Sequence, residues 1–457
     1  MLHLLSFCFV LLTLIVIGYV LKQAISGKTP LLSIRNVFLA GVIIFQLTSA
    51  ATSYYFGSFG ELPIGDPAGS GIRFLFIIST FLILFALVYE RRWFTFRIQD
   101  RIRVRTPIPG TGALLTMSFA CLIAGAIFKL GLSKLGLFGI LSEIFGLALV
   151  SMAAGSAAWA WASRPKNLLL LSLMLLIAGA AAAVAMYEAF GRRGVVSVMV
   201  SCLWGAYHGG FKHFDFKRAA IPLLVVGMSG VLLVAAFTST RGNKGKGVGV
   251  GEAVMRLANA DIGDGLLQLL AGQDAAGCSL WVIENRPEPF PYEPLGSLVY
   301  LAVNPIPRVI WDDKPIGLGS EMVKQSNVQG KGEEYSVGPG LVGHIVNDNP
   351  WISLPLYALL LGAWLRILDD LLKRFPDHPY VVIPLGIELG EILGIARGEM
   401  GFFLFRAIMG MVVAYFGTII MARLLRAVGF AYRPAEPEPE LEAMPDYADT
   451  YAAGVDE

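Results

Sequence analysis

The chain of 457 residues is too apolar for a soluble protein. Apolar side chains make up 55% of it, Asp, Glu, Lys and Arg only 15%, and the mean hydropathy is +0.65. A soluble protein of this size needs more charged surface than that. The net charge of +2 gives no reason to expect nucleic acid as a partner.

Apolar residues occur in blocks of about 20, the length that crosses a hydrocarbon core. Backbone groups in lipid must pair within their own segment and no barrel alternation is present, so each block is expected to be a helix. The sequence predicts an all-α polytopic membrane protein with about 11 spans, the first of them retained rather than cleaved. The candidate spans are 2–21, 36–56, 72–89, 111–130, 137–162, 167–188, 194–209, 220–238, 350–367, 379–396 and 402–424.

Basic residues in the connections predict the orientation, because cytoplasmic loops are enriched in Lys and Arg. In an eleven-span chain nearly all of these basic residues fall on one side of the membrane, and only Arg192 and Arg193 fall on the other. The N-terminus is therefore expected outside and the C-terminus in the cytoplasm. The agreeing residues are Lys22, Lys28, Arg35, Arg91, Arg92, Arg97, Arg101, Arg103, Arg105, Arg164, Lys166, Lys212, Lys217, Arg218, Arg366, Lys373, Arg374, Arg423 and Arg426.

The spans divide the chain into four parts. Residues 1–238 form an N-terminal bundle of about eight spans, and 350–424 hold about three more. Between them, 239–349 form a large extracytoplasmic loop, and loops of that length usually carry function. Helical spacing of apolar residues predicts an amphipathic helix within 252–270, and Cys278 is expected to be accessible from outside. Residues 425–457 form a cytoplasmic tail, disordered and rich in Pro and acidic residues.

The densest group of polar residues lies at 304–321, within the large loop. Three prolines restrict the backbone around Arg308 and Lys314, two cations suited to phosphate oxygens. Trp311 offers a flat apolar face on which a sugar can stack, and Asp312 is a candidate acid or base. The alternative interpretation is a rigid surface turn with solvated charges.

This segment resembles the signature of a known family. The similar residues are Ile306-Pro307-Arg308, Trp311, Lys314-Pro315, Gly319-Ser320-Glu321 and Gly338-Pro339-Gly340-Leu341-Val342-Gly343. They resemble the Wzy-type oligosaccharide repeat-unit polymerases, the O-antigen-polymerase-like membrane proteins of bacteria, over residues 280–425. One departure is His344, which stands where the family commonly has an acidic residue. The resemblance implies a GT-C/O-antigen-polymerase-like fold in the bacterial inner membrane.

The resemblance also implies a glycosyl transfer on the outer membrane face. The donor is an undecaprenyl-diphosphate-linked glycan, and a lipid-linked repeat unit supplies the acceptor hydroxyl. Arg308 and Lys314 are the expected diphosphate ligands, because fixed cations can stabilise the leaving group without a metal. Glu321, Asp312 and His344 are the candidates for the base or for orienting the acceptor. We expect no cofactor and no metal; membrane lipids, a flippase and a chain-length regulator are the further expected partners.

Two other segments carry positive charge. The Gly-rich run at 241–251 lacks the Lys-Ser/Thr of a nucleotide-binding loop. It is interpreted either as a plain linker or as a lid in which Arg241 and Lys246 contact the lipid phosphates. Arg397, followed by Gly398, matches an Arg-Gly pair of the resembling family and is expected to join Arg308. Arg406 adds charge at the same end; the alternative for Arg397 is an interfacial arginine.

The tenth span combines small and charged residues. Gly386, Gly390, Gly394 and Gly398 recur at every fourth position, which predicts close packing with a neighbouring helix. Glu388 and Glu391 lie in the same span, and charges at membrane depth usually face a cavity.

Three rival functions stay open on the sequence. An O-antigen-ligase-like glycan transferase would share the diphosphate site and differ on the acceptor side. A lipid-linked oligosaccharide transporter or flippase would usually show two related halves, and no such repeat is visible. A non-enzymatic assembly subunit is disfavoured by the charged Pro-Arg-Trp-Lys cluster.

Overall fold

The computed structural model describes residues 1–91, 107–132, 139–187, 193–213, 235, 259–270, 275–308, 310–326, 336–430 and 432–433. Several parts of the sequence interpretation lie outside these residues. They include the basic connection at 92–106, the eighth candidate span at 220–238 apart from one residue, the Gly-rich run with Arg241 and Lys246, the start of the predicted amphipathic segment at 252–258, and the tail beyond Arg433.

The structure confirms an all-α, multi-pass membrane protein. Within the described residues, eight helices are long and apolar enough to cross a membrane. The only β-structure in this part of the chain is a two-residue antiparallel ladder, in which β1 (Ile108–Pro109) pairs with β2 (Tyr432–Arg433). The eight helices are Leu2–Ile25, Ile34–Phe56, Pro67–Glu90, Thr111–Gly131, Leu141–Ala162, Leu168–Met186, Pro350–Arg374 and Met400–Ala427.

These eight helices match eight of the predicted spans, so the count of eleven stays a prediction. The seventh predicted span coincides with α9 (Arg193–Gly209), a helix of 17 residues. The tenth is a broken helix, with α18 (Pro379–Gly386) and α19 (Leu389–Gly394) separated at Ile387 and Glu388.

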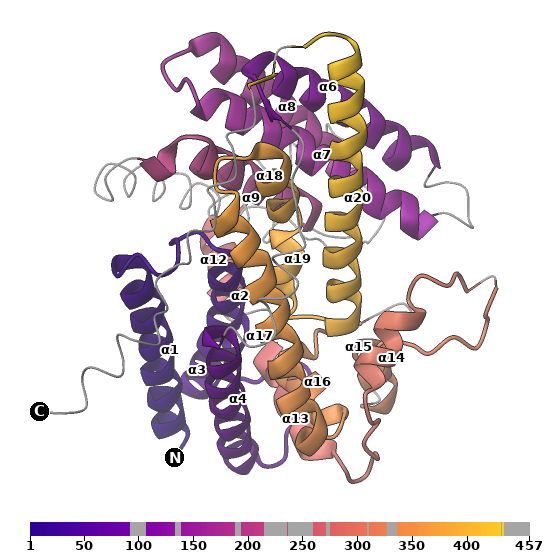
Figure 1. The fold of residues 1–457 in the computed structure, drawn as a ribbon. Helices are drawn as coiled ribbons and strands as arrows, with labels where there is room; N and C mark the ends of the chain where they lie inside the picture. Colours follow the sequence, from indigo (N-terminus) through magenta and orange to yellow (C-terminus); the bar gives the residue numbers. More distant parts are fainter. Residues whose placement is uncertain are drawn as a thin grey trace, which may run out of the picture.

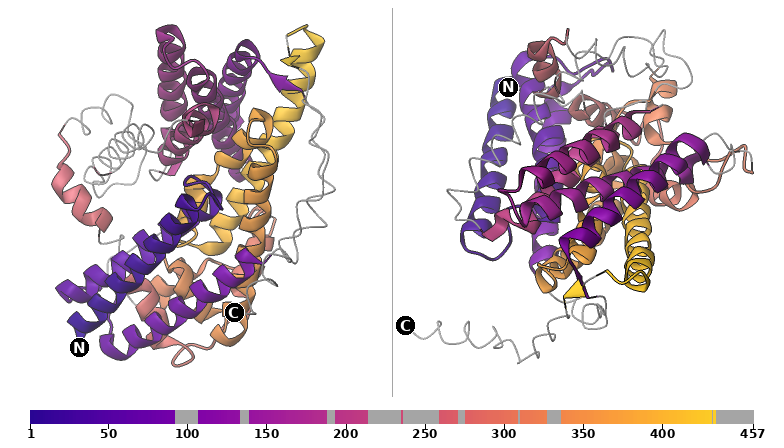
Figure 2. Two further views of the ribbon diagram at one scale, coloured as in Figure 1. Left: turned by 60° about the vertical axis from the view of Figure 1, so that its left-hand side comes forward. Right: turned by 90° about the horizontal axis from the view of Figure 1, so that it is seen from above.

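The N-terminal helices form two blocks (Figure 1). The first holds α1 (Leu2–Ile25), α2 (Ile34–Val42), the π-helix η1 (Ile43–Thr48), α3 (Ser49–Phe56) and α4 (Pro67–Glu90). The second holds α6 (Thr111–Ala126), the π-helix η2 (Ile127–Gly131), α7 (Gly139–Ala162), α8 (Leu168–Met186) and α9, followed by the 3-10 turn η4 (Phe211–His213). The views in Figure 2 show the two blocks standing apart at different inclinations.

The C-terminal helices connect the two blocks. Helix α17 (Pro350–Arg374) packs along α4 of the first block, and α20 (Met400–Ala427) packs on α7 of the second. The broken pair lies between the blocks, since α19 contacts both α2 and α9. Local sequence sets the helix starts: Ser33, Asp66, Asn167 and Asn349 each accept a hydrogen bond from a first-turn N–H.

The break between α18 and α19 is supported by α9. Pro384 lacks the N–H that would continue the helical ladder. The indole Nε1 of Trp204 donates to Val382 O at 2.7 Å, and Ser201 Oγ donates to Gly386 O at 3.5 Å. Side chains of a neighbouring helix thus bind carbonyls near the break, as backbone inside a membrane requires.

The glycine ridge packs closely, as the sequence predicts, but against two partners. A Cβ at Gly386 would lie 2.0 Å from Trp204, and one at Gly390 would lie 2.7 Å from Ser197, both on α9. Cβ atoms at Gly394 and Gly398 would instead meet the ring of Phe403 on α20. The change of partner falls after Gly390, since the glycines on either side of the break, Gly386 and Gly390, both meet α9.

The segment predicted as a large loop contains helices. Those in its described residues are α12 (Ile262–Leu270), α13 (Ala275–Asn285), α14 (Gly296–Val303), α15 (Leu318–Gln325) and α16 (Gly340–Asn347). Helix α12 falls within the predicted amphipathic segment. Every residue of α16 and Ala275–Ile283 of α13 are buried, and α13 packs against α3, α4 and η1.

The burial of α13 corrects one expectation. Cys278 is only 5% exposed, so it is not accessible as the sequence interpretation expected. The physical reason is the run of small residues around it, which lets the helix backbone approach its neighbours closely. A Cβ at Gly277 would lie 1.9 Å from the carbonyl oxygen of Phe59.

Candidate active site

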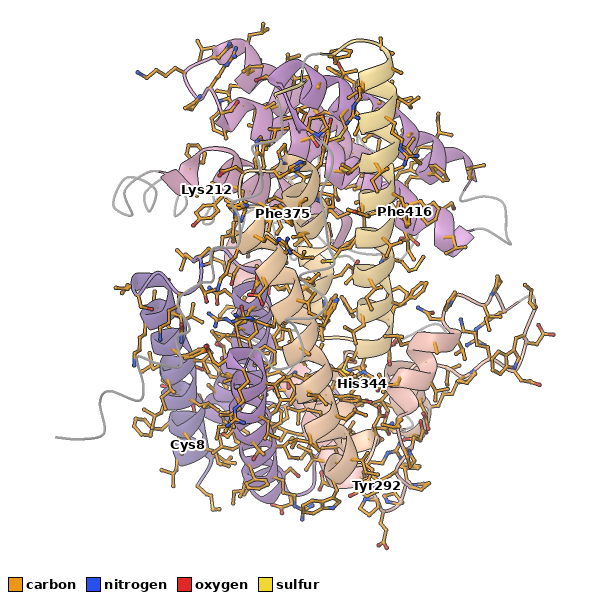
Figure 3. The ribbon with its side chains drawn as sticks, viewed as in Figure 1. Cys8, Lys212, Tyr292, His344, Phe375 and Phe416 are labelled. Carbon is orange, nitrogen blue, oxygen red and sulfur yellow. The ribbon has the colours of Figure 1, made fainter. Side chains whose placement is uncertain are left out.

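Charged and polar side chains gather where α14, α15 and α16 meet the start of α20. We call this group the polar cluster; its members are Arg286, Glu293, Ser297, Glu321, His344 and Glu399. Helix α14 packs directly on α20, where a Cβ at Gly401 would lie 2.6 Å from Ser297 O. Figure 3 marks His344 beside α14, below the lower end of α20.

His344 lies at the buried centre of the polar cluster. Its Nε2 accepts a hydrogen bond from the Met400 N–H at 3.0 Å. This places the proton of the neutral ring on Nδ1, which lies 2.6 Å from Ser297 Oγ. The carboxylate of Glu399 approaches Nε2 at 3.4 Å. The imidazole therefore joins α14, α16 and the start of α20.

The end of α16 fixes the chain that precedes α14. The Asn347 Oδ1 accepts from Arg286 Nε at 2.8 Å, and the Asn347 carbonyl accepts from the Glu293 N–H at 2.8 Å. Asp348 accepts from the Ser297 N–H at 2.8 Å. It also accepts from the hydroxyl of Tyr357 on α17. Each of these acceptors is buried, so the segment from 286 to 297 is held at both ends.

Glu321 occupies the first turn of α15 and is 23% exposed at its side chain. Its Oε1 lies 3.9 Å from Arg286 NH2 and accepts a hydrogen bond from Gln325. Burial raises the pKa of Glu321 to about 7, helped by the charge of Glu293 and a hydrogen bond with it. Arg286 opposes this rise and Glu399 adds to it. A carboxyl with this pKa changes protonation near neutral pH.

Glu399 binds the segment that follows the Pro-Arg-Trp-Lys motif. Its Oε2 accepts from the Gly319 N–H at 3.0 Å. A Cβ at Gly317 would lie 2.7 Å from the same oxygen, so the close approach requires glycine there. The motif and the start of α20 are thereby brought together.

The two cations of the motif hold the turn that contains them. Lys314 is buried, and its Nζ donates to Asn304 O at 2.7 Å and Ile306 O at 3.0 Å. Arg308 is exposed; its NH1 donates to Lys314 O at 3.0 Å and to Asp312 O at 3.4 Å, and its NH2 donates to Pro315 O at 3.4 Å. A guanidinium has five N–H donors, so these three bonds leave Arg308 able to bind a further anion.

The charges of Arg308 and Glu399 both act on the hydroxyl of Tyr300 in α14. Burial and the charge of Glu399 raise the pKa of the Tyr300 hydroxyl to about 12, while the charge of Arg308 opposes the rise. The pKa of Tyr300 is therefore affected by the charges of both Glu399 and Arg308. Trp311 and Asp312 are exposed on the same turn, and the Asp312 carbonyl accepts from Arg308.

The backbone of Arg397 lies close to the segment that leads into α16. A Cβ at Gly338, in that segment, would lie 2.6 Å from Arg397 O. Its guanidinium lies over the ring of Phe45, with the Cζ atom 5.8 Å from the ring centroid. The side chain therefore faces η1 rather than the motif turn.

Arg406 belongs to a second charged group, next to the helix break. Its Nε lies 3.0 Å from Glu391 Oε1, and its NH1 lies 3.7 Å from Glu143 Oε1. Glu143 also lies 3.5 Å from Lys129 Nζ. The carboxyl of Glu388 packs against α20, where a Cβ at Gly410 would lie 2.0 Å from it. The predicted inward-facing carboxylates of the tenth span are thus both buried.

Four members of the polar cluster are not predicted as site residues by the sequence. Arg286 and Glu293 lie in the Pro-rich stretch just before the motif, and Glu399 directly follows the Arg-Gly pair. The sequence feature that points to these three residues is a charged side chain close to a motif that already suggests a site. Ser297 offered no signal, because its role depends on the contact with His344 across the fold. Among the described residues, no group of three or more His, Cys, Asp or Glu side chains could hold a metal ion.

A scan against protein-family models, a search of the curated proteins and a search of the solved structures each find no match to this chain. The fold defines the class, an all-α multi-pass membrane protein.

Proposed function

We propose that the protein polymerises undecaprenyl-diphosphate-linked oligosaccharide repeat units into a surface or exopolysaccharide. The reaction would take place on the outer face of the bacterial inner membrane, with the N-terminus outside and the C-terminus in the cytoplasm. The observation that carries the proposal is the position of Glu321. Its carboxyl changes protonation near neutral pH and lies in the same cluster as Glu399, which binds the chain just after the arginine-containing turn.

The chemistry needs a base and a cation. The acceptor hydroxyl gives its proton to Glu321, and its oxygen forms a bond with the anomeric carbon of the donor. The bond from that carbon to the diphosphate breaks, and the electron pair leaves with the diphosphate. Arg308 stabilises the negative charge on the leaving group through its exposed guanidinium. Lys314 holds the turn by binding two carbonyls.

His344 and Glu399 act as positioning residues in this proposal. The imidazole is fully buried, so it does not reach a substrate, and it holds α14 against the start of α20. Glu399 fixes the glycines that follow the motif. Trp311 supplies the flat face for a sugar. The guanidinium of Arg397 lies over Phe45 and is given no part in the transfer.

A glycan profile tests the proposal. Cells in which the native gene carries Glu321→Gln are expected to contain single repeat units in place of long chains, with the protein still in the membrane. Glu288→Gln is the matched control, because Glu288 is an exposed carboxylate on the same loop. A wild-type ladder in the Glu321→Gln strain overturns the proposal. Loss of transfer to another acceptor, with polymer length unchanged, identifies a ligase.

One observation favours a second candidate, a lipid-linked oligosaccharide transporter. Discontinuous membrane helices often mark transport sites, and α18 and α19 form such a pair. The break carries the buried Glu388, and Glu391 with its partner Arg406 lies one turn further on. Accumulation of lipid-linked units on the cytoplasmic leaflet of a Glu388→Gln strain distinguishes this function from polymerisation.

A further inference from the structure

We infer that Arg286, Glu293 and Glu321 form a subsite for the hydroxyl groups of a neutral sugar, the acceptor of the proposed transfer. The inference rests on the proposed function, and it assigns the acceptor side of the reaction to specific residues.

The first argument is a buried donor without a hydrogen-bond partner. Arg286 is only 5% exposed, and its Nε is fixed by Asn347. Its NH2 has no hydrogen-bond partner among the described residues, although an unsatisfied buried N–H is costly. Glu321 Oε1 forms an ion pair with it at 3.9 Å, beyond hydrogen-bond distance. A hydroxyl oxygen beside this pair, about 2.8 Å from both atoms, can accept from the guanidinium and donate to the carboxylate, which is the bonding that a sugar hydroxyl offers.

The second argument is the charge of the group, which favours a neutral ligand. Arg286 is the cation of the group, and the charges of two carboxyls, Glu321 and Glu293, act on it. The two carboxyls offset the positive charge of Arg286, so a phosphate would find no excess positive charge here. This separates the subsite from the Arg308 turn, where the exposed cation favours anions.

The third argument is the wall beside these groups. The ring of Phe290 is half-buried, and the Arg286 Cζ lies 5.4 Å from its centroid. A second aromatic ring, that of Trp281, lies 6.0 Å from Phe290. Ligand sites commonly combine apolar aromatic surface with a few fixed polar groups. The Asn347 contacts provide the rigidity, because they anchor both Arg286 and Glu293.

The subsite identifies the hydroxyl group that gives its proton to Glu321 during the transfer. The hydroxyl bound between Arg286 and Glu321 is the nucleophile, and its proton passes to Glu321 as its oxygen bonds to the anomeric carbon. The charged groups that surround Glu321 are Glu293 before α14, Arg286 after α13 and Glu399 before α20. Glu293 touches the acceptor in this assignment and is therefore a catalytic residue.

Saturation-transfer NMR tests the subsite with the full chain in lipid nanodiscs. The probes are the methyl glycosides of glucose, galactose, mannose, rhamnose and N-acetylglucosamine, with inorganic pyrophosphate as a competitor. We expect at least one glycoside to bind, and to bind about tenfold or more weakly to Glu293→Gln and Arg286→Lys, because each loses a hydrogen bond to a charged group. Glu288→Gln is expected to bind as the wild type does, and pyrophosphate is expected not to compete.

The outcomes separate this inference from the proposed function. Absence of glycoside binding, equal binding to Glu293→Gln and Glu288→Gln, or displacement by pyrophosphate each overturns the subsite. Glu293 is exposed, so its variant is expected to fold even if Arg286→Lys does not. If glycosides bind as expected while Glu321→Gln cells keep a wild-type ladder, the subsite stands and the polymerase proposal fails.

Discussion

The imidazole Nε2 of His344 and the carboxylate Oε1 of Glu399 lie 3.4 Å apart, on elements that the sequence places far from each other. The same Nε2 accepts from the Met400 N–H, and Nδ1 contacts Ser297. His344 therefore links α14, α16 and α20 inside the protein, where its side chain is fully buried.

Replacing His344 by alanine is expected to destabilise the protein by about 2–4 kcal/mol, because it leaves the Met400 N–H and the Ser297 hydroxyl without partners and opens a cavity. Thermal unfolding in detergent measures the effect. His3→Ala is the control, since His3 is exposed near the N-terminus. A His344→Ala protein as stable as the control contradicts the structural role.

Transfer activity is expected to rise with pH through about 7. Glu321 accepts a proton only when ionised, and its pKa is raised to about 7 by burial and then by Glu293. Removing the charge of Glu293 lowers that pKa, so the acid limb of the pH–rate profile moves to lower pH in Glu293→Gln. The profile of kcat/KM measures this shift, and a limb that stays in place removes Glu321 as the base.

Arg308→Ala is expected to leave single repeat units in cells, whereas Arg308→Lys retains part of the activity through its charge. Lys cannot reproduce the planar fork that binds the carbonyls of Asp312 and Lys314. Asp313→Asn, an exposed change on the same turn, is the control for glycan profiles. Long chains in the Arg308→Ala strain exclude this arginine from the mechanism.

Gly386→Ala is expected to destabilise the packing of α18 on α9, because the new Cβ would lie 2.0 Å from the Trp204 ring. The cost of such overpacking is about 1–3 kcal/mol. Gly179→Ala on α8 is the matched control, with no atom within 4 Å of its new Cβ. Unfolding in detergent compares the two, and equal stability contradicts the described approach.

Asp369 joins α17 to the first block of helices. Its carboxylate accepts from the N–H groups of Ile34 and Arg35 at 2.8 and 3.1 Å and from the Tyr89 hydroxyl at 2.7 Å. Asp369→Ala is expected to cost about 3–5 kcal/mol, because two backbone N–H groups and the Tyr89 hydroxyl lose their buried acceptor. Tyr89→Phe removes one hydrogen bond and is expected to cost about 1 kcal/mol. Similar stabilities of the two variants contradict this account.

The sequence predicts the membrane class and the long spans well, because blocks of apolar residues of bilayer length permit few other structures. It does not locate the break at Glu388, although Pro384 is visible in the sequence, because the side chains that bind carbonyls near the break, Trp204 and Ser201, belong to another helix. The burial of α13 is missed for a similar reason. Its small residues do not indicate burial in the sequence, because the burial depends on their packing against Phe59 and α16.

The candidate site is predicted in part. The motif turn and Glu321 are chosen from residue type and spacing, and the structure binds the chain between them to Glu399, just before α20. The sequence cannot distinguish a cation that binds a ligand from one that binds carbonyls. Lys314 and Arg308 look alike in the sequence, yet the structure buries the first and exposes the second.

Reconstitution tests the central claim most directly. Lipid-linked repeat units extracted from a strain lacking the gene are incorporated into phosphatidylethanolamine–phosphatidylglycerol vesicles with the purified full chain. Wild-type protein is predicted to lengthen the glycan and release undecaprenyl diphosphate, and Glu321→Gln protein is predicted to do neither. Failure of the wild type to lengthen the glycan, or equal lengthening by both proteins, would contradict the proposal that Glu321 activates the acceptor in a repeat-unit polymerase.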